Sequence, residues 1–155
     1  MDGCFDLMHA GHFNAIRQAK LISPSLICGV VSDESVMLAK GPSILRENER
    51  KAIVDAVKWT DEVIVQDVYD VGIKELDDTN CQHYIHGDDP VYNAEGENTL
   101  EIMDKLGRFK YIKRTTGIST TDITGSLLKL IQPETEESMP TTNSRYAEPP
   151  KQEFL

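Results

Sequence analysis

The stretch DGCFDLMHAGH (Asp2–His12) has the pattern of a strand-to-helix turn and holds two histidines three residues apart, with a glycine between them. Apolar residues at helical spacing over Gly11–Leu21 place this pair at the start of a helix. A helix N-terminus offers unpaired N–H groups and partial positive charge. Glycine lets a phosphate approach the backbone, and two imidazoles can donate hydrogen bonds to it. The motif predicts a phosphate site; the alternative is a pair of exposed or metal-binding histidines.

Apolar runs that predict strands alternate with helical patterns along most of the chain. The expected strands are Ser25–Ser32, Glu62–Gln66, His83–His86 and Phe109–Lys113, and the expected helices are Gly11–Leu21, Glu47–Val57, Val71–Asp78, Thr99–Gly107 and Thr121–Ile131. This alternation predicts an α/β fold with a doubly wound parallel sheet. No apolar run precedes Asp2, so the first strand is expected to be missing. Each motif follows a predicted strand, where such sheets bind ligands.

Composition favours one domain over residues 1–131, followed by a disordered tail or interdomain linker over residues 132–155 that holds four prolines. The net charge of −10 argues against nonspecific nucleic-acid binding, which needs a basic face. Three cysteines without a CxxC pair argue against a disulfide framework or a zinc cluster. No apolar run is long enough to span a bilayer and no signal peptide is visible, so we expect a cytoplasmic protein.

A second oxyanion site is expected at RTTGISTT (Arg114–Thr121). An arginine, a glycine turn and a hydroxyl-rich helix start can together bind phosphate oxygens. The alternative is an ordinary capped helix, which Ser and Thr explain well, but capping needs neither Arg114 nor this number of hydroxyls.

Three other segments carry weaker signals. Lys40-Gly41-Pro42 could swing a lysine over a polyphosphate, although a plain surface loop is the better interpretation in isolation. Gly87-Asp88-Asp89 follows a strand and could contact a ribose or a base, with an Asx-type turn as the even alternative. By pattern alone, Glu49-Arg50-Lys51 and Lys58-Trp59 resemble a solvated helix face.

Taken in order, these segments resemble the cytidylyltransferase family, which acts on glycerol phosphate, choline phosphate and ethanolamine phosphate. The residues that carry the resemblance are DGCFDLMHAGH (Asp2–His12), KGP (Lys40–Pro42), NERKAIVDAVKWTDEV (Asn48–Val63), HGDD (His86–Asp89) and RTTGISTTDI (Arg114–Ile123). The ethanolamine-phosphate branch looks closest. The resemblance implies a Rossmann-like sheet of the HxGH nucleotidyltransferase type. It also implies cytidylyl transfer from CTP to phosphoethanolamine, with choline phosphate as the alternative substrate and an inactive CTP-binding fragment as the alternative to an enzyme.

The resemblance also implies roles for individual residues, carried over position by position. The catalytic residues would be His9, His12, Lys40 and Arg114. CTP would contact Cys4, Phe5, Gly11, Gly87, Asp88, Asp89, Thr115, Gly117, Ile118, Ser119 and Thr120. The second substrate would contact Asp6, Lys40, Arg50, Lys58, Tyr69 and Tyr92. Mg²⁺ would arrive with CTP, without a dedicated protein metal site. A homodimer or a tandem second domain, and a location that includes the endoplasmic reticulum surface, are further expectations.

Overall fold

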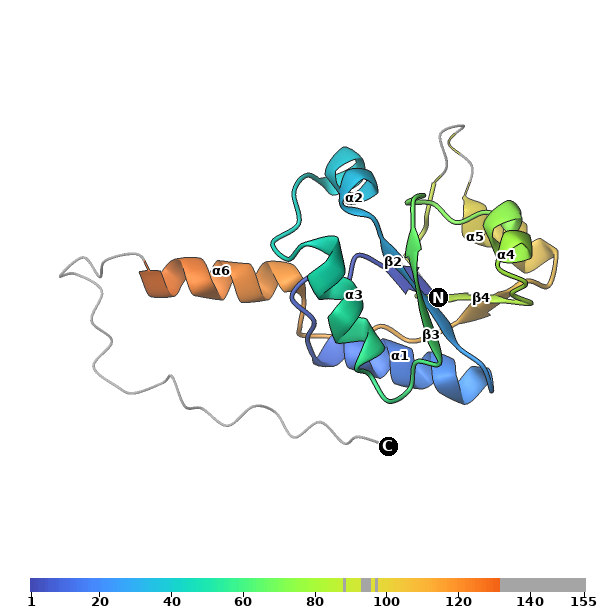
Figure 1. The fold of residues 1–155 in the computed structure, drawn as a ribbon, viewed down its shortest axis with the longest axis horizontal. Helices are drawn as coiled ribbons and strands as arrows, with labels where there is room; N and C mark the ends of the chain where they lie inside the picture. The colour runs from blue at the N-terminus through green and yellow to red at the C-terminus, as the bar shows by residue number, and fades with distance from the viewer. Residues whose placement is uncertain (88, 93–95, 97, 132–155) are drawn as a thin grey trace.

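The computed structural model describes residues 1–87, 89–92, 96 and 98–131, in which parallel strands alternate with helices (Figure 1). The strands are β1 (Asp2–Gly3), β2 (Ile27–Val31), β3 (Glu62–Gln66), β4 (Tyr84–His86) and β5 (Phe109–Tyr111). The helices are α1 (Ala10–Ile22), α2 (Asp33–Lys40), α3 (Glu47–Asp55), α4 (Ile73–Asp78), α5 (Thr99–Lys105) and α6 (Thr120–Ile131). The predicted tail, residues 132–155, lies outside the described residues. Within the described residues, no helix is both long and apolar enough to cross a membrane.

The strands form two parallel groups, β1-β2-β3 and β4-β5. One buried cluster joins them, because Ile85 of β4 and the nearby Ile112 pack with Val30 of β2, Ile16 of α1 and Val54 of α3. A second cluster lies between β4, β5 and the helices α4 and α5. The predicted α/β fold with a parallel sheet is therefore confirmed.

One expectation about the sheet is wrong: the first strand is not missing. Asp2 and Gly3 form β1, whose residues pair in parallel with Gly29 and Val30 of β2. The Met1 ammonium donates to the Ile27 carbonyl at 3.0 Å, and the Gly29 N–H donates to the Met1 carbonyl at 2.9 Å. Hydrophobic patterning does not mark this strand because it has two residues, and one of them is a buried carboxylate.

The Asp2 carboxylate links the two groups of strands. Its oxygens accept hydrogen bonds from the Tyr84 hydroxyl of β4 and from the Gln66 amide of β3, the latter at 2.8 Å. Asp2 is 8% exposed, and burial together with the Asp2 charge raises the pKa of Tyr84 well above its ordinary value. A buried carboxylate needs such donors to offset its lost hydration. This network holds β4 beside β1.

Arg50 does not belong to a solvated helix face, contrary to the interpretation of Glu49-Arg50-Lys51. Its side chain is completely buried. Its guanidinium donates to the Cys4 carbonyl at 2.6 Å, the Leu45 carbonyl at 3.2 Å and the Asp33 carboxylate at 2.7 Å. The pattern fails here because the Cys4 carbonyl, before α1, and the Leu45 carbonyl, before α3, both accept hydrogen bonds from this side chain.

Tyr84→Phe should lower the free energy of unfolding by about 1–3 kcal/mol, because the buried Asp2 carboxylate loses one of its two donors. Urea unfolding measures the change. Tyr111→Phe is the matched control, since Tyr111 lies on the adjacent strand and is 56% exposed. Equal unfolding midpoints for the two variants would contradict a linking role for the Asp2 network.

Candidate functional site

The turn between β1 and α1 has an unusual backbone. Phe5 and Leu7 both have positive φ, 52° and 45°, although neither is a glycine. Residues with side chains avoid this region because of steric clashes, and such conformations cluster at functional sites. Phe5 is nevertheless 3% exposed and packs in the main core. The packed ring thus holds the turn that leads into the paired histidines.

His9 and His12 lie at the start of α1 as predicted, with ring centroids 4.1 Å apart. The Nδ1 atom of His9 accepts the Gly11 N–H at 3.1 Å, and the Nδ1 atom of His12 accepts the His9 N–H at 3.3 Å. A neutral imidazole that accepts at Nδ1 carries its proton at Nε2. Both rings therefore keep an Nε2–H donor for a ligand.

The protonation of both histidines agrees with this geometry. Burial lowers the pKa of His12 to about 4, and the neighbouring His9 contributes to the shift. Burial also lowers the pKa of His9. Near pH 7 both imidazoles are thus neutral hydrogen-bond donors rather than cations.

Gly11 is required between these histidines for steric reasons. A Cβ atom at this position would lie 2.9 Å from the His9 ring and 3.5 Å from the Ile118 side chain. The first distance is shorter than real contacts allow, so a side chain here would displace His9. The second shows that the turn before α6 reaches the start of α1, and Gly117 in that turn has a φ of 79°. The two predicted anion sites therefore lie together.

The hydroxyl-rich segment before α6 divides into two parts. Ser119 caps α6, because its Oγ accepts the Asp122 N–H at 3.1 Å and donates to the Asp122 carboxylate at 2.6 Å. Thr120 donates to the Asp6 carbonyl at 3.1 Å. Both hydroxyl hydrogens are therefore engaged within the protein. Thr115 differs, since its oxygen accepts the Asn14 amide at 2.9 Å, a bond that does not use the hydroxyl hydrogen.

Two charged candidates meet at the rim of this region. Arg114 forms an ion pair with Asp89, and both side chains are about 60% exposed. Asp89 and Gly87 directly follow β4, as predicted, whereas Asp88 lies outside the described residues. Exposed pairs of this kind contribute little stability, so the guanidinium can exchange its partner for a phosphate at small cost.

Hydrogen bonds to Asp6 connect the loop before α3 to the turn before α1. Its carboxylate accepts the Ile44 and Leu45 N–H groups at 2.6 and 2.9 Å, and the residue is 9% exposed. This loop begins next to Lys40, the last residue of α2, and Gly41 follows with a φ of 89°. Asp6 therefore anchors the loop that follows the predicted catalytic lysine.

Lys40 and Tyr69 come together from separate segments, with the ammonium 5.4 Å from the ring centroid. This distance permits a cation–π contact. Tyr92 is 62% exposed, and its backbone forms an isolated antiparallel β-bridge with Asn98. Cys4 presents its carbonyl to Arg50, and burial raises the pKa of its thiol. The contacts that Arg50 and Cys4 show are structural, and their ligand roles stay predictions.

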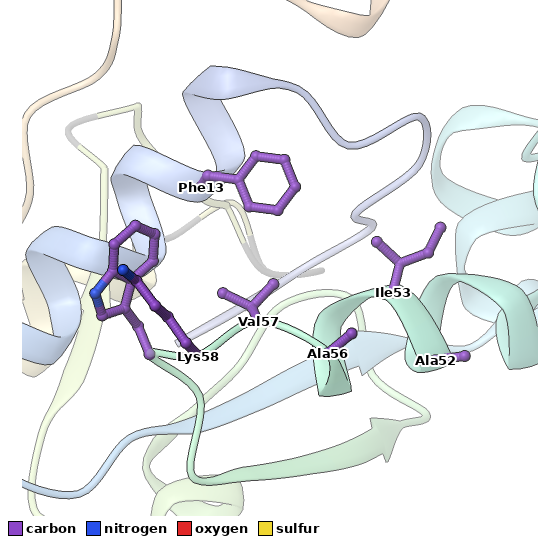
Figure 2. Close-up of a pocket in the computed structure, with 7 residues that line it drawn as sticks. Phe13, Ala52, Ile53, Ala56, Val57 and Lys58 are labelled. Atoms are coloured by element: carbon purple, nitrogen blue, oxygen red, sulfur yellow. The ribbon is translucent and has the colours of Figure 1, made fainter.

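Lys58 lies at a different place, in a pocket of about 590 Å³ between α1 and the end of α3 (Figure 2). Its ammonium lies 4.9 Å from the Trp59 ring centroid. Phe13 of α1 faces Ile53 and Val57 across the pocket, and Ala52, Ala56 and Trp59 also line it. Neither His9 nor His12 lines this pocket, and a substrate role for Lys58 stays a prediction.

Two polar residues that connect the site segments were not anticipated. Asn14 contacts Thr115, and Gln18 forms two hydrogen bonds with the Lys113 backbone, at 2.9 and 3.0 Å. Both lie on one face of α1, because residues four apart in a helix are neighbours. In the sequence, the only sign of this role is that two amide side chains lie four residues apart on the helix that begins with the paired histidines.

The low pKa of His12 predicts a pH effect on stability. The unfolded histidine has a pKa near 6.5, so between about pH 4 and 6.5 the unfolded chain binds more protons than the folded chain. The free energy of unfolding should therefore rise with pH across this window, and His12→Gln should flatten the rise. Urea unfolding at several pH values and NMR titration of the ring measure both effects. An NMR midpoint near 6.5 for the His12 ring in the folded protein would refute the lowered pKa.

Comparison with known proteins gives a family match over most of the chain. Residues 1–125 match the family model described as cytidylyltransferase-like. The chain is 45% identical over 149 residues to an ethanolamine-phosphate cytidylyltransferase of Arabidopsis thaliana, covering 94% of this chain and 35% of that protein. A choline-phosphate cytidylyltransferase of the same plant is 36% identical, over 83% of this chain and 43% of that protein. The chain thus spans between a third and a half of the length of these relatives.

A solved structure shares the fold. The lipopolysaccharide core biosynthesis protein from Thermoplasma volcanium superposes with a TM-score of 0.58, at 23% identity, over 76% of this chain and 94% of that one. The family model covers most of the chain, including both segments in which an anion site is predicted. The chain therefore belongs to the cytidylyltransferase-like family.

Proposed function

We propose that this chain transfers a cytidylyl group from CTP to phosphoethanolamine, giving CDP-ethanolamine and pyrophosphate. The observation that carries the proposal is the arrangement of donors where α1 meets the turn before α6: His9, His12 and Thr115 each use an acceptor atom internally and keep a hydrogen for a ligand. Such a surface suits the oxygens of a polyphosphate. The names of the more similar relatives support ethanolamine phosphate as the second substrate.

The proposed mechanism is a direct displacement at the α-phosphorus. An oxygen of the phosphoethanolamine phosphate attacks, the bond to the β-phosphate oxygen breaks, and pyrophosphate leaves with that electron pair. Negative charge grows on the phosphate oxygens in the transition state. The Nε2–H groups of His9 and His12 stabilise it, and Arg114 attracts the β- and γ-phosphates. Neutral imidazoles suit this role because they need no proton transfer to act.

Lys40 and Tyr69 are proposed to receive the second substrate. The lysine can neutralise the incoming phosphate, and Gly41 allows it to move. The aromatic face that now lies near the lysine could then contact the substrate ammonium. Asp6 supports both steps, since it anchors the loop next to Lys40.

Mg²⁺ is proposed to enter with CTP, bound by the phosphate oxygens. Over the described residues, no group of three or more His, Cys, Asp or Glu side chains could hold a metal ion. Association with a second cytidylyltransferase domain, as a homodimer or in tandem, stays a prediction. A cytoplasmic location that includes the surface of the endoplasmic reticulum also stays a prediction.

Assays with CTP and either phosphoethanolamine or phosphocholine test the substrate. We expect kcat/KM to be at least about tenfold higher with phosphoethanolamine, because a phosphoethanolamine site can use N–H donors that choline lacks. Equal values would refute the ethanolamine assignment. If CTP raises the unfolding temperature without turnover, the chain binds the nucleotide but is not an enzyme by itself. If CTP has no effect on the unfolding temperature, the nucleotide site is refuted.

His12→Ala should reduce kcat by at least about 10²-fold, the usual loss for a donor that stabilises transition-state charge. His83→Ala is the matched control, because His83 is exposed and lines a separate pocket with Asp77 and Arg108. The control should keep the wild-type rate. A His12→Ala variant that folds and retains activity would overturn the assigned role.

A further inference from the structure

Among the contacts that join the two anion-binding segments, the pair Asn14–Thr115 has a direction that matters chemically. The Asn14 amide nitrogen donates to the Thr115 hydroxyl oxygen at 2.9 Å. A hydroxyl has one hydrogen and can also accept. Since the bond from Asn14 occupies an acceptor position, the Thr115 hydrogen is left to donate elsewhere. If the amide were reversed, its oxygen would take that hydrogen.

Arg17 determines which way the Asn14 amide faces. The Asn14 carbonyl oxygen accepts two hydrogen bonds from the Arg17 guanidinium, from Nε at 3.2 Å and from Nη2 at 2.8 Å. A guanidinium has donors only, so the amide oxygen must face Arg17. The amide nitrogen must then face Thr115. The orientation follows from the chemistry of the neighbours and does not depend on telling nitrogen from oxygen by position.

Gln18 holds the partner segment in register. Its amide donates to the Lys113 carbonyl at 2.9 Å and accepts the Lys113 N–H at 3.0 Å. These two bonds fix the backbone two residues before Thr115 against α1. Asn14 lies one helical turn earlier than Gln18, on the same face and nearer the paired histidines. The hydroxyl of Thr115 is therefore placed relative to the start of α1 by two side chains of that helix.

We propose that Asn14 is a positioning residue of the nucleotide site: by donating to Thr115, it makes the Thr115 hydroxyl a hydrogen-bond donor toward the phosphates of the nucleotide. The proposal deepens the proposed function and rests on it for the identity of the nucleotide. It assigns Asn14 no contact with substrate. Its action passes through the direction of one hydrogen bond, and Arg17 sets that direction.

Asn14→Asp is the informative substitution because it keeps the shape and the contact with Arg17 but reverses the bond to Thr115. A carboxylate only accepts, so it captures the Thr115 hydrogen. The Kd for CTP and for inorganic tripolyphosphate should rise at least about tenfold, the loss expected for a hydrogen bond to a charged group. Calorimetry on the full chain measures both, and CTP kinetics should show KM rising more than kcat falls.

The added charge of N14D could weaken anion binding without any action through Thr115, and a double-mutant cycle separates the two effects. In a Thr115→Val background the hydroxyl is absent, so adding N14D should change the Kd no more than about twofold. In a Thr115→Ser background, which keeps the hydroxyl, N14D should have its full effect. An equal effect of N14D in the Val and Ser backgrounds would overturn the proposal.

Two further variants complete the design. Lys20→Met is the control on the same helix: Lys20 contacts Asp61 and the Pro24 carbonyl, away from the paired histidines, and its loss should leave the Kd unchanged. Asn14→Leu removes the donor without adding charge and should show the same dependence on the Thr115 background if N14D proves unstable.

Tripolyphosphate separates this proposal from the proposed function. If N14D weakens tripolyphosphate binding in a chain that never forms CDP-ethanolamine, the positioning role stands and the proposed function fails. If the wild-type chain forms CDP-ethanolamine and N14D binds both anions as tightly as wild type does, the positioning role fails and the function stands.

Discussion

The candidate site depends on the hydrogen bonds of one residue, Asp6. Its carboxylate accepts two N–H groups of the loop after Gly41, and its carbonyl accepts the Thr120 hydroxyl at the start of α6. Three segments that are distant in sequence therefore meet at the turn before α1. The strained backbone on either side, at Phe5 and Leu7, is tolerated because these bonds and the buried Phe5 ring hold it. Arg50 adds to the same assembly by donating to the Cys4 and Leu45 carbonyls.

Sequence patterns predicted most of the elements because their signals are local. Helix α1 follows from its helical periodicity and strand β3 from its apolar run, and the paired histidines lie at the N-terminus of α1 as predicted. The cap of α6 is likewise local, because Ser119 and Asp122 lie three residues apart. The resemblance to the cytidylyltransferases, confirmed by the family model, supplied the rest of the functional interpretation.

What the patterns could not predict depends on contacts between distant polar groups. Strand β1 has no apolar run, and its buried Asp2 is explained only by Tyr84 and Gln66, which lie more than sixty residues away. Arg50 resembled a solvated residue because its carbonyl partners belong to turns outside its own helix. The division of the hydroxyls, with Ser119 and Thr120 engaged internally and Thr115 available, likewise depends on partners that no spacing rule identifies.

In the proposed nucleotide site, the orientation of the histidine and threonine donors has a consequence for discrimination among nucleotides. A surface that presents only hydrogens to phosphate oxygens treats ATP, GTP, UTP and CTP alike, since their triphosphates are identical. Preference for one base must then come from elsewhere, and the segment after β4, with Gly87 and Asp89, is separate in sequence from both proposed anion-binding turns. Because Asp89 pairs with Arg114, that segment is physically linked to the proposed phosphate site. Base choice and phosphate binding would thus be energetically coupled through an exchange of ionic partners, while each is encoded in a different part of the chain.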